Sequence, residues 1–371
     1  LLVGAGLCIK GFQKARQIEI GFDPDHVLAA GLRIGMNGYT EETGKIFYRQ
    51  LRERLAALPG VKEASLASWL PLGFEGGGSL NVDVEGYARV PNEDVSIPFS
   101  IVSPRYLATL RIPLLDGRDF TDQDDDKSEK VAIVNEIMAK RFWPGQNPLG
   151  RRFKIGRGTV VVVGIVKAGK YRSLNEEPKP FFYLPYQQGV WDLNLGVSLR
   201  TQANPATMIG ALEREIHALD PGVEVWAKLP MTDYIQAAFL AQRIASTLLI
   251  GLGLVALVLA AMGIYGVMAY VVSQRTHEIG IRMALGADTR AVVKLVLGQG
   301  MTLAMIGVGF GLLGAFAVTR LLSNFLYGVS PFDPVTFVGV SLVLGTVTLL
   351  ACYLPARRAT KVDPMVALRG E

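Results

Sequence analysis

The spacing of apolar and polar residues divides the chain into two regions of different character. Between about residues 21 and 241, short runs rich in β-branched residues are bounded by glycine, proline, asparagine or aspartate, as is typical of strands and turns. Beyond residue 241, long stretches carry no charged residue at all. The pattern predicts a globular α+β domain followed by segments suited to an apolar environment.

Eight segments of the first region have the composition of strands, and three repeat apolar residues at helical spacing. The predicted strands are 27–34, 61–67, 80–85, 98–102, 131–134, 159–166, 195–200 and 223–227, and the predicted helices are 40–58, 134–142 and 205–219. The first helix places Phe47, Leu51 and Leu55 on one face. The order strand, helix, strand occurs at both ends of the region. This order predicts a domain built from its own ends, with an inserted subdomain at roughly residues 80–190.

The last third of the chain contains three stretches without a charged residue, at 244–274, 295–319 and 335–356. Crossing a hydrocarbon core of about 30 Å takes about 20 residues of helix, because each residue adds about 1.5 Å. Each stretch is long enough. We therefore predict membrane spans at about 244–272, 295–319 and 335–356, with a loop at 273–294 between the first two.

The first nine residues are apolar but too short to cross a bilayer alone. A signal peptide carries its basic residues before the apolar run, whereas here Lys10, Lys14 and Arg16 follow it. We interpret residues 1–20 as the end of a truncated first transmembrane helix together with its exit from the membrane.

The distribution of basic residues predicts the orientation, because cytoplasmic loops carry an excess of lysine and arginine. The loop 273–294 and the tail 357–371 are both rich in these residues. The loop 323–334 between the last two spans has neither and carries Asp333. We therefore expect this loop and the domain at 21–241 to be extracytoplasmic, with the basic loop and the tail in the cytoplasm.

Composition excludes several other classes of protein. The chain of 371 residues is 50% hydrophobic and only 19% charged, as expected when a soluble domain is joined to a membrane region. A net charge of +5, scattered along the chain, gives no basic surface of the kind that binds nucleic acid. Cys8 and Cys352 cannot form a disulfide framework, and the three histidines lack the spacing of metal ligands.

Three motifs resemble known sites, but each lacks a residue or a setting that the site requires. Residues 164–170 match the phosphate-binding pattern G-x-x-x-x-G-K, yet Tyr171 stands where the magnesium-binding serine or threonine belongs. Residues 309–314 match G-x-G-x-x-G inside an apolar stretch, where small residues favour helix packing. Residues 122–126 begin like a calcium loop, but Lys127 occupies the glycine position. We predict no catalytic site, cofactor or metal on this chain.

Small and polar residues of the second complete span predict contacts between helices. Gly307, Gly311 and Gly314 are spaced so that another helix can approach closely. Gln299 is the one strongly polar side chain deep in this span. It either forms a hydrogen bond between helices or marks a functional position.

The loop after the first complete span contains one amphipathic stretch, EIGIRMALGA. It consists of Glu278, Ile279, Gly280, Ile281, Arg282, Met283, Ala284, Leu285, Gly286 and Ala287, which we call the coupling element. Its mixture of apolar side chains and two charges allows it to lie on a bilayer surface or to press against a partner protein. A solvated connecting loop is the alternative interpretation.

Two sequences in the expected cytoplasmic regions resemble those of the FtsX/MacB family of ABC-transporter permeases. They are QRTHEIGIRMALGA at 274–287 and PARRATKVDPMVALR at 355–369. The external region resembles the MacB-type periplasmic core domain at 134–153 and 162–186. The loop GVSPFDP and the openings LLVGAGL and GFDPDHVL further resemble the second half of duplicated, ATPase-less permeases of the acidobacterial type.

The resemblance implies a multi-pass α-helical protein of the bacterial cytoplasmic (inner) membrane with an extracytoplasmic α+β domain. The MacB-like periplasmic core domain would occupy 21–241 and the FtsX-like permease domain 242–371. The family implies four transmembrane helices per unit and action as a homodimer or as two permease halves in one chain. It also implies a separate ABC ATPase subunit, which would contact the coupling element; the duplicated subfamily leaves the existence of that partner open.

On this resemblance we expect a permease subunit for export or mechanotransmission that acts on an envelope substrate of the peptide, antibiotic or lipoprotein class. The alternative is a non-transporting membrane scaffold or sensor, whose periplasmic domain regulates an envelope enzyme or binds a ligand. A neighbouring gene for an ATPase would favour the first function. A neighbouring gene for an envelope hydrolase or a two-component sensor would favour the second.

Overall fold

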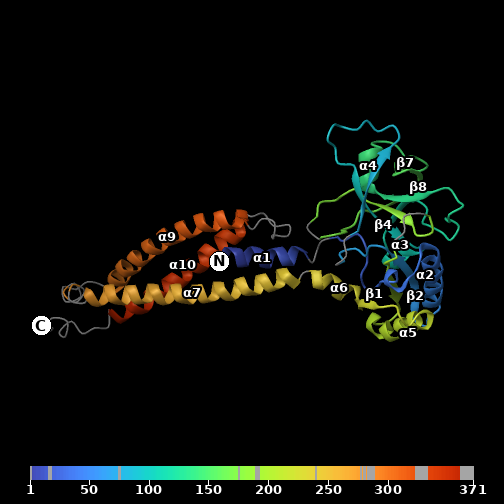
Figure 1. Cartoon of the computed structure of the whole chain (residues 1–371). Coiled ribbons are helices and arrows are strands. Elements are labelled where there is room, and N and C mark those ends of the chain that lie inside the picture. The colour runs from blue at the N-terminus through green and yellow to red at the C-terminus, as the bar shows by residue number, and fades with distance from the viewer. Residues whose placement is uncertain are drawn as a thin grey trace. The chain divides into compact units, whose positions relative to one another are not determined.

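The structure, a computed structural model, describes residues 2–15, 19–73, 77–173, 176–188, 193–238, 240–275, 278, 281, 289–321 and 333–359 (Figure 1). The chain divides into two compact units. One, the helical unit, comprises Leu1–Gln17 and Ala241–Glu371, and the other, the sheet domain, comprises Ile18–Leu240. Each unit is built around contacts of its own.

The described part of the helical unit consists of α1 (Leu2–Ala15), α7 (Leu240–Gln274), α9 (Thr289–Leu321) and α10 (Pro334–Ala359). Three segments are long and apolar enough to cross a membrane: Ile244–Gln274, Gly300–Ala317 and Pro334–Pro355. Their large apolar side chains point outward, and Phe310, for example, is 74% exposed. This exposure suits helices whose surroundings are lipid rather than water. The three predicted apolar spans are confirmed as helices.

Polar contacts join the helices near both ends of α10. On α1, the Lys10 Nζ lies 2.7 Å from the Asp333 Oδ1. The same carboxylate caps α10, because it accepts hydrogen bonds from the backbone N–H and the hydroxyl of Thr336. Lys10 and Thr336 together hold the pKa of Asp333 below its ordinary value. Near the other end, the Arg358 Nη1 donates to the Tyr265 hydroxyl of α7 at 2.9 Å.

The sheet domain is built around one mixed sheet of eleven strands. The strands are β1 (Val27–Leu32), β2 (Val61–Ala67), β3 (Ser79–Val84), β4 (Ser96–Val102), β5 (Leu114–Gly117), β6 (Val131–Asn135), β7 (Arg152–Ile155), β8 (Gly158–Val166), β9 (Phe182–Pro185), β10 (Gly196–Thr201) and β11 (Val225–Pro230). The helices are α2 (Glu41–Ala56), α3 (Tyr106–Leu110), α4 (Glu136–Phe142), α5 (Ile209–Leu219) and α6 (Met231–Ala238), with 3-10 turns at Gly35–Asn37 and Pro205–Met208.

Strand β4 joins the two halves of this sheet. Its first residues pair with β3, its last residue, Val102, pairs with Ala67 of β2, and most of its length runs parallel to β9. One half, in the order β11-β1-β10-β2, comes from the two ends of the domain sequence. The other half, with β3, β7, β8, β6 and β9, comes from the sequence between them.

The core of the first half is formed where α2 packs on β2 and α5. The helix begins at a capping box, in which the side chains of Thr40 and Thr43 each accept a hydrogen bond from the other's backbone N–H. The predicted face of Phe47, Leu51 and Leu55 is buried. Burial of each such side chain contributes about 1.5–3 kcal/mol, so this face holds the helix to the sheet.

The eight predicted strands and three predicted helices are all present, with shifts of a few residues at their ends. The sequence pattern missed β5, β7 and β9, as well as α3 and α6. The three strands have only four residues each, which is too short for an alternating pattern to stand out. Helix α3 has five residues and offers barely one turn of periodicity.

Because its core is self-contained, we expect residues 19–238 to fold without the helical unit. Expressed alone, this fragment should unfold cooperatively in urea, with a free energy of unfolding of about 5–15 kcal/mol, as is usual for domains. Circular dichroism in the near and far ultraviolet should report the same transition. Loss of the near-ultraviolet signal with retained helical signal would contradict a self-sufficient core.

Candidate functional site

The coupling element lies mostly outside the described residues. Glu278 and Ile281 are helical and exposed, with Ile281 40% exposed. The other predicted members of the element lie outside the described residues. They are Ile279, Gly280, Arg282, Met283, Ala284, Leu285, Gly286 and Ala287. Contact of this element with a partner therefore stays a prediction.

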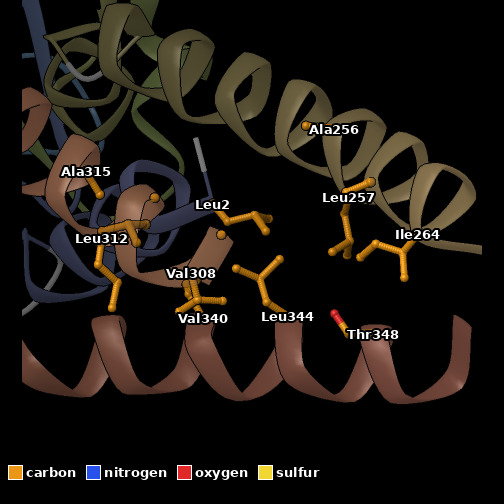
Figure 2. A pocket seen from close by; sticks show the side chains of 14 residues that line it. Leu2, Ala256, Leu257, Ile264, Val308, Leu312, Ala315, Val340, Leu344 and Thr348 are labelled. Atoms are coloured by element: carbon orange, nitrogen blue, oxygen red, sulfur yellow. The ribbon is translucent and has the colours of Figure 1, made fainter. Parts of the chain in front are cut away.

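The glycines predicted to pack helices do not do so within the described chain. At Gly307, Gly311 and Gly314, no atom of the described chain lies within 4 Å of the point where a Cβ would stand. Gly307 and Gly311 are among the residues that line an apolar cavity of the helical unit. Figure 2 labels Leu257 and Leu344, which line the same cavity. Packing of these glycines against a helix of another subunit remains a prediction.

Close approach between helices occurs at other glycines. A Cβ on Gly6 of α1 would lie 2.8 Å from the Thr336 Cγ2 of α10, and one on Gly300 of α9 would overlap the sulfur of Cys352. These positions are far apart in sequence from the residues they meet. For that reason, spacing along one helix could not reveal them.

The sheet domain begins with a leading segment, residues 19–25, that follows α1 in sequence. It is fixed by Arg200 of β10, whose side chain is only 4% exposed. The Arg200 Nη2 donates to the Asp23 carbonyl at 2.7 Å and Nη1 to the Asp25 carbonyl at 2.8 Å. The Nε donates to the Thr109 carbonyl in α3 at 2.6 Å. One buried guanidinium thus ties the leading segment, β10 and α3 together.

The leading segment is also bonded to the other half of the sheet domain. The backbone N–H of Lys170 donates to the Ile20 carbonyl at 2.9 Å. Lys167, just after β8, lies 2.7 Å from Glu19 and lowers the pKa of that carboxyl by donating a hydrogen bond to it. Gly21 has a φ of +83°, and a Cβ there would overlap the backbone of Gly169. The stretch that resembles a phosphate-binding loop therefore packs against the chain's own backbone.

The sheet domain ends on the strand next to the one where it begins. Strand β11 pairs with β1 and leads through α6 towards α7. A side chain at Gly31 of β1 would overlap the indole ring of Trp226 of β11, which covers it. In α6, Met231, Tyr234 and Ile235 are buried, so this helix is packed rather than free. The leading segment precedes β1 and α6 follows β11, so both ends of the sheet domain adjoin strands that pair with each other.

The leading segment and α6, the two described ends of the sheet domain, are therefore both packed against its sheet. Within the described residues, no cluster of three or more histidine, cysteine or carboxylate side chains is placed to hold a metal ion.

Comparison with known families identifies the sheet domain. The family model described as the MacB-like periplasmic core domain matches residues 10–219. The chain belongs to this family. A second family model, the FtsX-like permease C-terminal, matches residues 250–364, which contain α9, α10 and most of α7. The MacB-like core and the FtsX-like permease region thus account for most of the chain.

Curated relatives of this MacB-like chain have names that refer to export. The macrolide export ATP-binding/permease protein MacB of Wolinella succinogenes is 27% identical over 294 residues, covering 76% of this chain and 45% of that protein. The pyoverdine export ATP-binding/permease protein PvdT of Pseudomonas putida is 26% identical, covering 70% and 41%. A probable syringafactin export ATP-binding/permease protein, SyfD of Pseudomonas syringae, is 28% identical, covering 76% and 43%. The chain spans less than half the length of these relatives.

Two solved structures are also similar. The periplasmic region of MacB from Actinobacillus actinomycetemcomitans is 14% identical with a TM-score of 0.41, covering 62% of this chain and 97% of that one. The extracellular domain of the noncanonic ABC-type transporter YknZ from Gram-positive bacteria is 20% identical with a TM-score of 0.35, covering 53% and 98%. Membership of the MacB-like family rests on the family model.

The contacts of Arg200 predict a large loss of stability when it is replaced. In the 19–238 fragment, Arg200→Met leaves three backbone carbonyls without their donor, so the free energy of unfolding should fall by about 3 kcal/mol or more. Arg111→Met is the matched control. Arg111 also pairs with Asp23, but its side chain is 60% exposed, so its loss should cost only about 0–1 kcal/mol. Urea titration measures both, and equal effects would contradict the central role of Arg200.

Proposed function

We propose that this MacB-like chain is the permease part of an ABC-type system that exports an envelope substrate or moves it mechanically. The observation that carries this proposal is that both described ends of the sheet domain, the leading segment and α6, are packed against its own sheet. Movement of α1 and α7, which adjoin these ends in sequence, would act on the sheet domain through the leading segment and α6. The names of the relatives refer to export and support the same class of activity, with molecules of the macrolide, pyoverdine or syringafactin type as candidate substrates.

The proposed orientation places the sheet domain and the loop before α10 on the extracytoplasmic side. The ion pair between Lys10 and Asp333 supports it, because it puts the end of α1 and the beginning of α10 on the same side of the helical unit. The sheet domain follows α1 in sequence. Arg358, bonded to Tyr265 near the opposite end of α10, belongs to the basic tail expected in the cytoplasm.

The proposed energy source is an ABC ATPase that binds the coupling element in the cytoplasm. The relatives combine ATP-binding and permease in their names, and this chain spans only their permease part, so the ATPase is either a separate subunit or a further part of the same protein. A second permease half or a second copy of this chain would complete the transporter. The proposed domains are those of the sequence prediction, with the MacB-like domain at 21–241 outside the membrane and the FtsX-like permease domain at 242–371.

The orientation is tested by cysteine labelling in intact cells, in a background with Cys8 and Cys352 changed to serine. Ser330→Cys should react with a membrane-impermeant maleimide added from outside. Thr276→Cys should react only after the cells are opened. The opposite pattern would invert the orientation and place the coupling element outside, where no ATPase could reach it.

The coupling element is tested by its apolar residues. At an interface, loss of a buried anchor commonly costs more than about 2 kcal/mol, whereas an exposed charge contributes about 0–1 kcal/mol. Met283→Asp and Leu285→Asp should therefore abolish co-purification of the cognate ATPase and substrate-stimulated ATP hydrolysis. Gly286→Val should also impair coupling, because it crowds a position suited to close backbone approach.

Arg290→Ala, just outside the element, is the control and should leave ATPase binding unchanged. Membrane insertion of every variant is checked by the same cysteine-labelling assay. If all four variants lose activity equally, the loop has misfolded; if none has an effect, the element is a solvated connection and its proposed contact with an ATPase is wrong.

A further inference from the structure

The two ends of the sheet domain are joined through one loop of its second half. This bridge loop, residues 167–173, follows β8 and overlaps the stretch that resembles a phosphate-binding loop. The leading segment lies on one side of it, because the Lys170 N–H donates to the Ile20 carbonyl at 2.9 Å. The bridge loop thus contacts the end of the domain that adjoins α1 in sequence.

The bridge loop also reaches α6, through a short turn at residues 70–73. The Leu72 N–H donates to the Tyr171 carbonyl at 2.7 Å. At the end of this turn, a Cβ on Gly73 would lie only 2.6 Å from the Tyr234 hydroxyl of α6. Because the Tyr234 side chain is buried, the turn and the helix are in direct contact. The end of the domain that adjoins α7 in sequence therefore meets the same loop.

The side chain of Tyr171 fixes the bridge loop to the second half of the sheet. Its ring stacks on Phe181, with the ring centroids 3.7 Å apart and the planes 4° from parallel. Its hydroxyl accepts a hydrogen bond from the Asn135 Nδ2 at 3.2 Å. Asn135 is the last residue of β6, and Phe181 directly precedes β9. Since Tyr171 is only 5% exposed, the loop cannot shift without disturbing these contacts.

Little backbone separates the two hydrogen bonds of the bridge loop. They start from adjacent residues, Lys170 and Tyr171, which share one planar peptide bond. Packed protein interiors are poorly compressible, so displacement of one group shifts its neighbours. A displacement of Ile20 would therefore reach Leu72 through a short, anchored stretch of chain.

We propose that the bridge loop couples the leading segment to α6, so that displacement at one end of the sheet domain changes the packing at the other. The pairing of β1 with β11 also links the two ends, and the bridge loop adds a second route through the other half of the sheet. The coupling is a property of the sheet domain. Its use in moving a substrate rests on the proposed function.

The test measures amide hydrogen exchange of the full chain in nanodiscs by mass spectrometry. Gly169→Ala crowds the leading segment, because its Cβ would lie 2.9 Å from the Ile20 carbonyl oxygen. Gly73→Ala crowds α6 at the Tyr234 hydroxyl. We expect each variant to raise exchange about fivefold or more in both the leading segment and α6, because overpacking at either contact strains the shared loop.

Gly44→Ala is the matched control for crowding. Its Cβ would lie 2.8 Å from the Leu193 Cδ2, which is an overlap of similar size at α2. Exchange of the leading segment and α6 should stay unchanged in this variant. The proposal is wrong if Gly169→Ala and Gly73→Ala each loosen only their own end, or if Gly44→Ala loosens both ends as much.

Tyr171→Phe decides the outcome if either of the first two glycine variants fails to fold. It removes the hydroxyl that accepts from Asn135 and from the Gly169 N–H, and it keeps the ring. Exchange should rise at both ends. Tyr48→Phe, which loses a buried hydroxyl with two hydrogen bonds at α2, should leave both ends unchanged. Equal results from the two tyrosine variants would overturn the coupling.

These measurements contain neither a substrate nor an ATPase, so their outcome does not depend on the proposed export function. Loss of the cross-effect would remove the bridge and leave the export function standing. A chain that shows the cross-effect but exports nothing would contradict the export function and leave the bridge standing.

Discussion

The sheet domain depends on one buried cation. Arg200 of β10 lies where this strand, α3 and the leading segment meet, and its donors satisfy one backbone carbonyl of α3 and two of the leading segment. A buried charge without such partners would be costly, so the three segments are held in one arrangement. The leading segment consequently moves with the sheet. Force applied to the leading segment therefore acts on the sheet domain as one body, which is a physical requirement for transmitting motion over a distance.

Much of the fold was predictable from sequence because most strands and helices carry a local signal. The strand 159–166 and the helix face of Phe47, Leu51 and Leu55 follow from composition and spacing. Pairing between strands was not predictable in this way. The parallel contact between β4 and β9 joins segments about 80 residues apart, and no pattern within either segment specifies its partner.

The functional parts were less accessible to sequence reasoning. Arg200 ends a predicted strand and looks like any surface arginine, because only the folded chain shows that three carbonyls surround it. The spacing of Gly307 and Gly311 predicts a helix packed against them, but spacing along one helix cannot say which helix that is. Close approach at Gly300 depends on Cys352, which lies on another helix. Such features are properties of pairs of distant residues.

One such pair restricts how the sequence can change. Gly31 and Trp226 lie on adjacent strands, and the indole occupies the space that any side chain at position 31 would need. A larger residue at position 31 can be accommodated only if position 226 becomes smaller in the same lineage. Two sites separated by nearly the whole domain therefore evolve as one unit. Enlarging position 31 first overpacks the contact, and shrinking position 226 first leaves a cavity, so either order passes through a destabilised intermediate.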